Sequence, residues 1–93
     1  MDNGRKVDVI CQHTQDGSVI PLRVRFTDDD GQRQTFNIKE YNDLSHRGTR
    51  TMQNGVYVTD ATLVFECHIV VFNNLRTITL YYEPLHTSWI MTT

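Results

Sequence analysis

The chain has few of the residues that favour helices. It contains one alanine, three glutamates and two lysines among its 93 residues. A helical bundle or a doubly wound α/β domain is therefore not expected, because alanine and the straight-chain residues are the ones that propagate helices. The Rossmann and P-loop chemistries are excluded with them, since both hold phosphate at a helix N-terminus. The five glycines are isolated, and no glycine-rich phosphate-binding motif is present.

Cysteine is scarce too, and its two copies, Cys11 and Cys67, cannot build the disulfide framework of a small secreted domain. No CxxC or HxxxH spacing is present, so we predict no metal and no other cofactor. The other side chains considered as metal ligands are His13, His46, His68 and His86. We expect both cysteines to be small buried hydrophobic residues. The two thiols would be close together only if the first strand lay beside the strand that contains Cys67.

The sequence also lacks a run of roughly 18 apolar residues, the length that a membrane-spanning helix needs. We therefore expect no membrane partner. Because no apolar segment follows the first residues, we expect no signal peptide and a cytoplasmic location. The formal net charge of −2 gives no strong electrostatic case for DNA, RNA or anionic lipid. The basic residues are nevertheless unevenly placed, since six of the nine lie between positions 23 and 50.

Residues that favour strands are abundant instead. Nine valines, six isoleucines, twelve threonines and nine aromatic residues fit a pleated, half-buried surface better than a helix. Alternation with a period of two predicts the first three strands over Val7–His13, Val19–Phe26 and Gln32–Lys39. The side chains expected to point into the core from the first two strands are Val7, Val9, Cys11, Ile20, Leu22, Val24 and Phe26.

The outer face of the second and third strands is expected to carry three arginines. With Phe26 opposite Gln32, Arg25 lies across from Arg33, and Arg23 follows on the same side. Two like charges directly across a ladder are mildly destabilising. Unless the acidic turn at 28–30 neutralises them, these guanidinium groups favour an anionic partner.

The middle of the chain, from 40 to 54, has the least regular pattern. Tyr41 and Leu44 are expected to form one helical turn against the core. The Asn-Gly pair at 54–55 is a strong hairpin signal. The two strands expected on either side of it are Thr49–Gln53 and Val56–Thr59.

The clearest hairpin follows, with one strand over 61–72 and the other over 75–82. Asn73-Asn74 is predicted as its two-residue turn, because asparagine tolerates a positive φ. The inward pairs expected across this hairpin are Ile69 with Ile78, Cys67 with Leu80, and Phe65 with Tyr82. A last strand over 88–91 is expected to add two more inward pairs, Tyr82 with Trp89 and Leu80 with Met91.

Short strands separated by turns about every 8–12 residues indicate a small sandwich or barrel. A flat sheet would expose an apolar face and two edges, which a barrel removes by closure. We predict an all-β fold: a small, partly open β-barrel or roll of six to eight short antiparallel strands, of SH3-like or OB-like size, forming a single β domain over residues 1–93.

These features favour a protein-interaction or assembly module. Val64, Val70 and Phe72 lie on the second face of their strand, where an unidentified protein partner or self-association would bury them. Residues 40–54 folding over this face within one monomer is the competing interpretation.

The alternative function is a single-stranded nucleic-acid-binding accessory protein. Its groove would use the arginine-rich strand face, with Tyr41 and Tyr57 as stacking surfaces. The candidate binding residues for either function are Arg23, Arg25, Arg33, His46, Arg47 and Arg50.

An enzyme is the least favoured function. Asp43, Ser45 and His46 are close in sequence, but a catalytic triad is defined by geometry rather than by sequence proximity. A second polar group on one strand face consists of Glu66, His68 and Tyr81. We interpret that group as a solvated surface with a cross-strand Glu–Tyr pair, and we predict no catalytic residue.

Overall fold

Every regular element in the described part of the chain is a β-strand. The computed structural model describes residues 4–27, 30–45, 48–51, 57–84 and 87–93. Its strands are β1 (Arg5–His13), β2 (Val19–Thr27), β3 (Arg33–Asp43), β4 (Arg50–Thr51), β5 (Tyr57–Val58), β6 (Leu63–Val71), β7 (Asn74–Glu83) and β8 (Ser88–Thr92). Within those residues no helix is long and apolar enough to cross a membrane.

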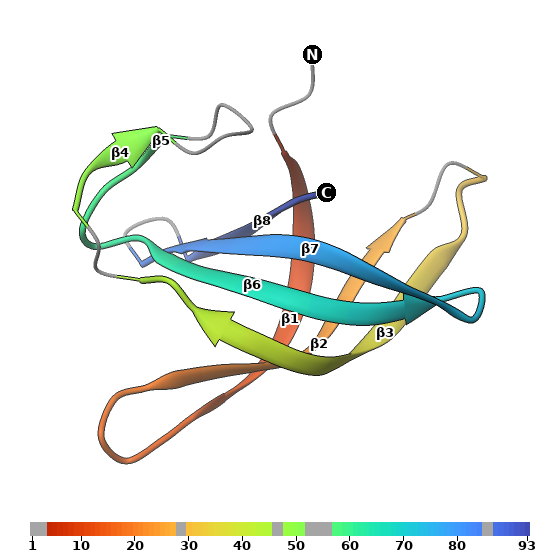
Figure 1. Ribbon diagram of the computed structural model, residues 1–93, viewed down its shortest axis with the longest axis horizontal. Coiled ribbons are helices and arrows are strands. Elements are labelled where there is room, and N and C mark those ends of the chain that lie inside the picture. Colours follow the sequence, from red (N-terminus) through yellow and green to blue (C-terminus); the bar gives the residue numbers. More distant parts are fainter. Residues whose placement is uncertain (1–3, 28–29, 46–47, 52–56, 85–86) are drawn as a thin grey trace.

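Six strands form a closed antiparallel barrel in the order β1-β2-β3-β6-β7-β8 (Figure 1). Closure depends on β1, which pairs with β2 on one side and with β8 on the other. The contact with β8 is short, because only Arg5–Val7 face Trp89–Met91. The turn end of the β1–β2 hairpin extends away from the barrel body (Figure 1). The predicted all-β barrel is therefore confirmed, and the β1–β8 pairing closes it.

The apolar set predicted by alternation largely fills the barrel interior. The buried members of this core are Val7, Val24, Phe65, Cys67, Ile69, Ile78, Leu80, Trp89 and Met91. Trp89 packs on Tyr82 with ring centroids 4.8 Å apart. Full burial stabilises a side chain of this kind by about 1.5–3 kcal/mol, so this cluster is the main source of the barrel's stability.

A β-bulge in β2 interrupts the predicted alternation. Ile10 pairs with Arg23 whereas Cys11 pairs with Pro21, so Leu22 is an extra residue in the ladder. A bulge places two residues opposite one and shifts the facing of everything on one side of it. Leu22, predicted to be in the core, is consequently 42% exposed, while Pro21 is buried.

The same bulge explains a second error in β2. Val24 and Phe26, which follow the bulge, are core residues as predicted. Before the bulge, Val19 packs against the core in the place predicted for Ile20. Alternation was therefore right for one half of the strand and out of phase in the other.

The ladder between β2 and β3 differs from the predicted register by two residues. Phe26 pairs with Gln34 rather than with Gln32, and Thr27 joins the ladder opposite Arg33. Because the difference is even, each side chain keeps its predicted face. Arg25 therefore lies across from Thr35 instead of Arg33, which removes the predicted direct contact of like charges.

β3 continues where a helical turn was expected. The strand runs to Asp43, and Tyr41 pairs with Cys67 of β6. A register shift between Ile38 and Glu40 allows this continuation. The predicted helical turn at Tyr41 and Leu44 was therefore wrong.

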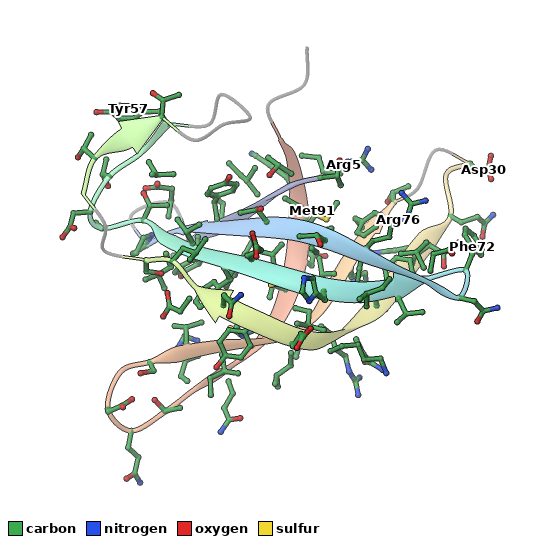
Figure 2. The ribbon with its side chains drawn as sticks, in the orientation of Figure 1. Arg5, Asp30, Tyr57, Phe72, Arg76 and Met91 are labelled. Atoms are coloured by element: carbon green, nitrogen blue, oxygen red, sulfur yellow. The ribbon has the colours of Figure 1, made fainter. Side chains whose placement is uncertain are left out.

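The turn between β6 and β7 lies one residue earlier than predicted. Val71 pairs with Asn74, so Phe72 and Asn73 form the turn, with φ angles of 49° and 65°. The Asn74 side-chain amide donates to the Phe72 carbonyl at 3.3 Å. Phe72 is 87% exposed and lies at the hairpin tip (Figure 2).

This turn sets the hairpin register two residues from the predicted one. The observed cross-strand pairs are Ile69 with Arg76, Cys67 with Ile78, Phe65 with Leu80, and Leu63 with Tyr82. The inner and outer faces are unchanged, since the difference is again even. The predicted pairs between β7 and β8, Tyr82 with Trp89 and Leu80 with Met91, are both confirmed.

A second, smaller apolar cluster lies outside the barrel. Val64 and Tyr81 are buried with Val58 of β5, and Leu44 and Ile90 pack against them. The Leu44 amide donates to the Val64 carbonyl at 2.8 Å, which ties the end of β3 to this cluster. Coverage of Val64 within one monomer is therefore confirmed.

The hairpin that supplies Val58 is a separate two-stranded sheet. In it Arg50 pairs with Val58 and Thr51 with Tyr57. The predicted Asn-Gly turn at 54–55 lies outside the described residues. The coverage stops short of the far end of β6, where Val70 and Phe72 remain exposed.

Candidate functional site: an arginine face

Three of the predicted binding residues share one outer surface of the barrel. Arg23, Arg25 and Arg33, which we call the arginine face, lie opposite Asn37, Thr35 and Thr27 in the β2–β3 ladder. Arg23 and Arg25 alternate with Val24 and Phe26, which point into the barrel, and Arg33 lies on the same outer face of β3. All three guanidinium groups therefore project outward from the same side of the barrel.

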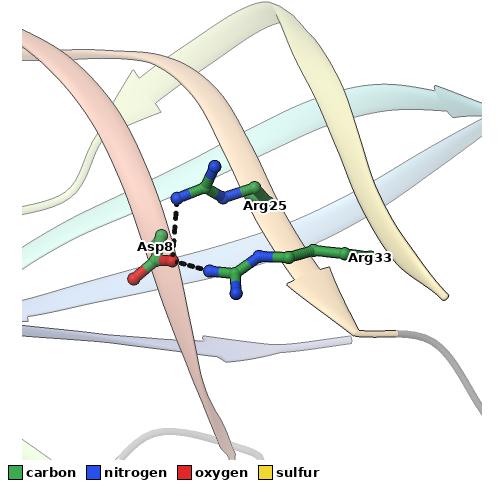
Figure 3. Close-up of polar contacts among 3 residues, drawn as sticks. All are labelled: Asp8, Arg25 and Arg33. Carbon is green, nitrogen blue, oxygen red and sulfur yellow. Dashed lines mark hydrogen bonds and ion pairs between the residues drawn. The ribbon is translucent and has the colours of Figure 1, made fainter. Parts of the chain in front are cut away.

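An aspartate from the neighbouring strand organises this face. Asp8 of β1 pairs with Arg25 in the ladder, and one carboxylate oxygen accepts from Arg25 Nη2 at 3.2 Å. The same oxygen also accepts from Arg33 Nη2 (Figure 3). All three side chains are about half exposed, and exposed ion pairs contribute only about 0–1 kcal/mol to stability. The main consequence of the contact is that guanidinium groups from two neighbouring strands meet at one carboxylate oxygen.

A small cavity of about 210 Å³ adjoins this cluster. Its charged lining consists of Lys6, Arg25 and Arg33 with Asp8, and its apolar lining includes Val7 and Phe26. The lining therefore carries three cationic side chains and one carboxylate, and two of those cations, Arg25 and Arg33, contact it. Such a cavity suits an acidic side chain, because carboxylate and guanidinium form charge-assisted hydrogen bonds.

Two exposed aliphatic residues extend the arginine face. Ile10 is 50% exposed and lies directly across the ladder from Arg23. Leu22, the extra residue of the bulge, lies beside Arg23 in the chain and is 42% exposed. Neither was predicted from the sequence, because Leu22 was placed in the core and strand alternation carries no sign of a bulge. Asp8 and Lys6 were missed as well, although both alternate with Val7 on β1.

Three other binding residues were predicted from the sequence. Of these, His46 and Arg47 lie outside the described residues, as does the side chain of Arg50. The Arg50 backbone belongs to β4, in the two-stranded sheet rather than the barrel.

The cysteines lie on strands that are not neighbours. β1 pairs with β2 and β8, so the condition for proximity of Cys11 to Cys67 is not met. Burial raises the pKa of the Cys11 thiol. Desolvation, with a smaller contribution from the charge of Glu66, raises the pKa of Cys67 to about 12. Both are therefore protonated at neutral pH, a state that suits neither a nucleophile nor a metal ligand.

A second cavity of about 470 Å³ contains the Cys11–His13 pair, whose Sγ and Nε2 atoms are 3.7 Å apart. Tyr82 and Trp89 line it as well. Throughout the described residues, no group of three or more His, Cys, Asp or Glu side chains could hold a metal ion. His46 and His86, also considered as ligands, lie outside those residues.

Among the described residues considered for catalysis, Tyr81 does not join Glu66 and His68 in one polar group. His68 Nδ1 lies 2.7 Å from Glu40 Oε1 across the β3–β6 ladder. Glu66 pairs with Thr79 and Tyr81 with Val64, so the predicted cross-strand Glu–Tyr pair was wrong. Tyr81 is instead buried in the second cluster.

Ser45 has a structural contact of its own. Its hydroxyl accepts from the Val64 amide at 2.8 Å, and its own amide donates to Asp43 Oδ1 at 2.9 Å. These bonds fix the chain where it leaves the barrel.

Comparison of the chain with protein-family models, with curated proteins and with solved structures gave no match. A functional assignment therefore depends on the geometry of the surface described above.

Proposed function

We propose that the protein is a non-catalytic protein-binding module whose arginine face receives an acidic, partly apolar segment of a partner. The observation that carries this proposal is the cavity lined by three cationic side chains, Lys6, Arg25 and Arg33, and by one carboxylate, that of Asp8. Ile10 and Leu22 supply exposed aliphatic surface close by. Arginine is enriched among the residues that contribute most of the binding energy of protein interfaces, and exposed aliphatic side chains beside it add apolar area that a partner can bury.

The ion pairs within the cluster support the same function. Arginine presents a rigid fork of donors that matches a carboxylate, and Asp8 already restrains two such forks. Binding then requires less ordering of long side chains, which is one of the main entropic costs of association. We place the module in the cytoplasm as part of this proposal, because its free thiols suit a reducing compartment.

A nucleic-acid ligand has less support from the same surface. Stacking platforms are needed for single strands, and neither predicted tyrosine lines the cavity beside the arginine face. Tyr57 belongs to the separate two-stranded sheet, and Tyr41 packs edge-on against Phe65 at 5.9 Å. The test must therefore distinguish a peptide from two competing ligands of this surface, a nucleic acid and a second copy of the chain.

The test is selection from a random peptide display library on the purified protein. We expect enriched peptides that combine Asp or Glu with Leu or Ile, and affinity that falls as salt is raised. Arg33→Gln should weaken the best peptide by about tenfold, as expected for loss of a hydrogen bond between charged groups. Arg76→Gln, on β7 and away from this face, is the matched control and should bind as the parent does.

Three results would contradict the proposal. The first is enrichment without an acidic bias, or equal binding by Arg33→Gln. The second is tighter binding of a single-stranded oligonucleotide than of any selected peptide in a low-salt titration. The third is a concentration-dependent dimer in sedimentation that Arg23→Glu dissociates.

A further inference from the structure

One mouth of the barrel contains a cavity of about 450 Å³ that is distinct from the arginine face. Its apolar lining includes Phe26, Ile69, Ile78 and Met91, whose side chains belong to the barrel core or pack against it. Two arginines, Arg5 and Arg76, line the same cavity. Figure 2 shows both arginines on the same side of the barrel as Met91.

The two arginines reach this cavity because they occupy inner positions of their strands. Arg5 precedes the core residue Val7 by two positions, and Arg76 precedes Ile78 by two. In the ladders Arg5 pairs with Met91 and Arg76 with Ile69. Alternation therefore directs both side chains toward the barrel axis, at the ends of strands where the interior opens to solvent.

The two guanidinium groups differ in what they already contact. The guanidinium carbon of Arg5 lies 5.8 Å from the centroid of the Phe26 ring, and its Nη1 donates to the Thr27 carbonyl at 3.3 Å. The Arg76 side chain has no hydrogen-bond or ion-pair partner among the described residues. No Asp or Glu of the described residues lines the cavity, and its other polar lining residues are Thr77 and Thr93. The mouth thus combines an apolar floor with two cationic groups, and no carboxylate side chain of the described residues accompanies them.

We propose that this mouth binds a small anionic amphiphile, a medium-chain carboxylate, with its head group between Arg5 and Arg76 and its alkyl chain on Phe26, Ile78 and Met91. The volume lies within the range of about 300–1,000 Å³ that is typical of small-molecule sites. An apolar floor with a few polar groups at the rim is also the usual composition of such sites. The two cavities share Phe26 in their linings but no arginine, so substitutions of the arginines test this inference separately from the peptide-binding role.

The test is a titration with sodium octanoate, hexanoate and neutral 1-octanol, followed by calorimetry and by NMR of side-chain methyl groups. Octanoate should bind about fifteenfold more tightly than hexanoate, since each buried methylene is worth about fourfold in affinity. 1-Octanol should bind more weakly than octanoate because it lacks the charge. The methyl signals of Met91 and Ile78 should shift on binding.

Variants separate the head-group contact from the apolar contact. Arg76→Gln should weaken octanoate binding by about fivefold and leave 1-octanol binding unchanged, as for loss of an exposed charge pair. Arg23→Gln, on the arginine face, removes one positive charge elsewhere and should change neither affinity. Superimposable circular dichroism spectra and melting curves would show that the variants are folded.

Four outcomes would overturn the proposal. Three concern affinity: octanoate and 1-octanol bind equally, Arg76→Gln leaves octanoate affinity unchanged, or inorganic phosphate binds as tightly as octanoate. The fourth is that chemical-shift changes on binding are confined to signals from Trp89 and Tyr82. The last of these would place the ligand in the cavity beside Cys11 instead.

Discussion

The turn between β6 and β7 contains a residue whose backbone angle does not suit it. Phe72 has a φ of 49°, in the left-handed region that bulky residues seldom adopt. Hairpin turns with positive φ at both central positions prefer Asn-Gly, and asparagine tolerates the first of these positions well. We therefore expect Phe72→Asn to stabilise the protein, although most substitutions destabilise.

The magnitude follows from two terms. The left-handed conformation costs an ordinary residue roughly 1–2 kcal/mol, and asparagine should recover about 1 kcal/mol of that. Phe72 is 87% exposed, so its removal sacrifices about an eighth of the value of a buried phenylalanine, or about 0.3 kcal/mol. The net gain is about 0.7 kcal/mol, which raises the Tm of a domain of this size by about 3–5 °C.

The assay is thermal unfolding followed by circular dichroism, with urea unfolding as a second measure of stability. Phe72→Val is the matched control, because it removes a similar exposed surface but places a β-branched residue in the left-handed region. Its Tm should lie below that of the parent. A Phe72→Asn protein that melts at or below the parent temperature, or a Phe72→Val protein as stable as Phe72→Asn, would refute the argument from backbone strain.

Three further results are expected. Val58→Ala should lower the free energy of unfolding by about 2 kcal/mol, since Val58 is fully buried in the outer cluster. Tyr57→Ala, at the neighbouring exposed residue, should change stability little. Equal effects of the two substitutions would show that the cluster is not formed. Ellman's reagent should label Cys11 slowly and Cys67 only after unfolding, because the pKa of Cys67 is about 12; equal labelling rates in the native protein would contradict its burial. Hydrogen bonds from the Thr14 hydroxyl and the Ser18 amide lower the pKa of the Asp16 carboxyl group. The ionised carboxylate therefore stabilises the fold at pH values above the pKa of Asp16 in the unfolded chain. That stabilisation is lost as the pH falls through the lower pKa of Asp16 in the folded protein. The stability deficit of Asp16→Asn should accordingly be largest near neutral pH and vanish in acid, whereas a deficit that grows on acidification would reverse the sign.

The sequence was sufficient to predict the fold class, the strands and most of the core. The reason is that side-chain facing depends on alternation, which a register error of two residues leaves intact. The β2–β3 ladder and the β6–β7 hairpin were both predicted two residues out of register, yet their inner and outer faces were right. The turn signal at Asn73-Asn74 placed the β6–β7 turn one residue late, because Phe72 took a position that its side chain disfavours.

Bulges were the features that alternation could not reveal. The bulge at Leu22 exposes a leucine and buries Pro21, and the register shift near Lys39 lets β3 continue to Asp43. Neither leaves a distinctive mark in the sequence, since a bulge depends on the pairing of two strands rather than on one. The ion cluster on the arginine face was missed for a related reason, because Asp8 and Arg33 lie on strands that are separated by β2, so no single ladder brings them together.

The arginines of the barrel strands fall into two groups according to whether their side chains point outward from the barrel or toward its axis. This difference distinguishes them more clearly than how closely they are spaced in the sequence. Arg23 and Arg25 fall on outer positions of β2, where guanidinium groups meet solvent or a partner surface. Arg5 and Arg76 fall on inner positions, where a charged side chain is tolerated only at a strand end that opens to water. An inner position two residues before a core residue is therefore informative even when the arginine is isolated in sequence. The cluster of basic residues between 23 and 50 predicts a basic outer surface, whereas the positions of Arg5 and Arg76 in the alternation of their strands indicate the barrel mouth.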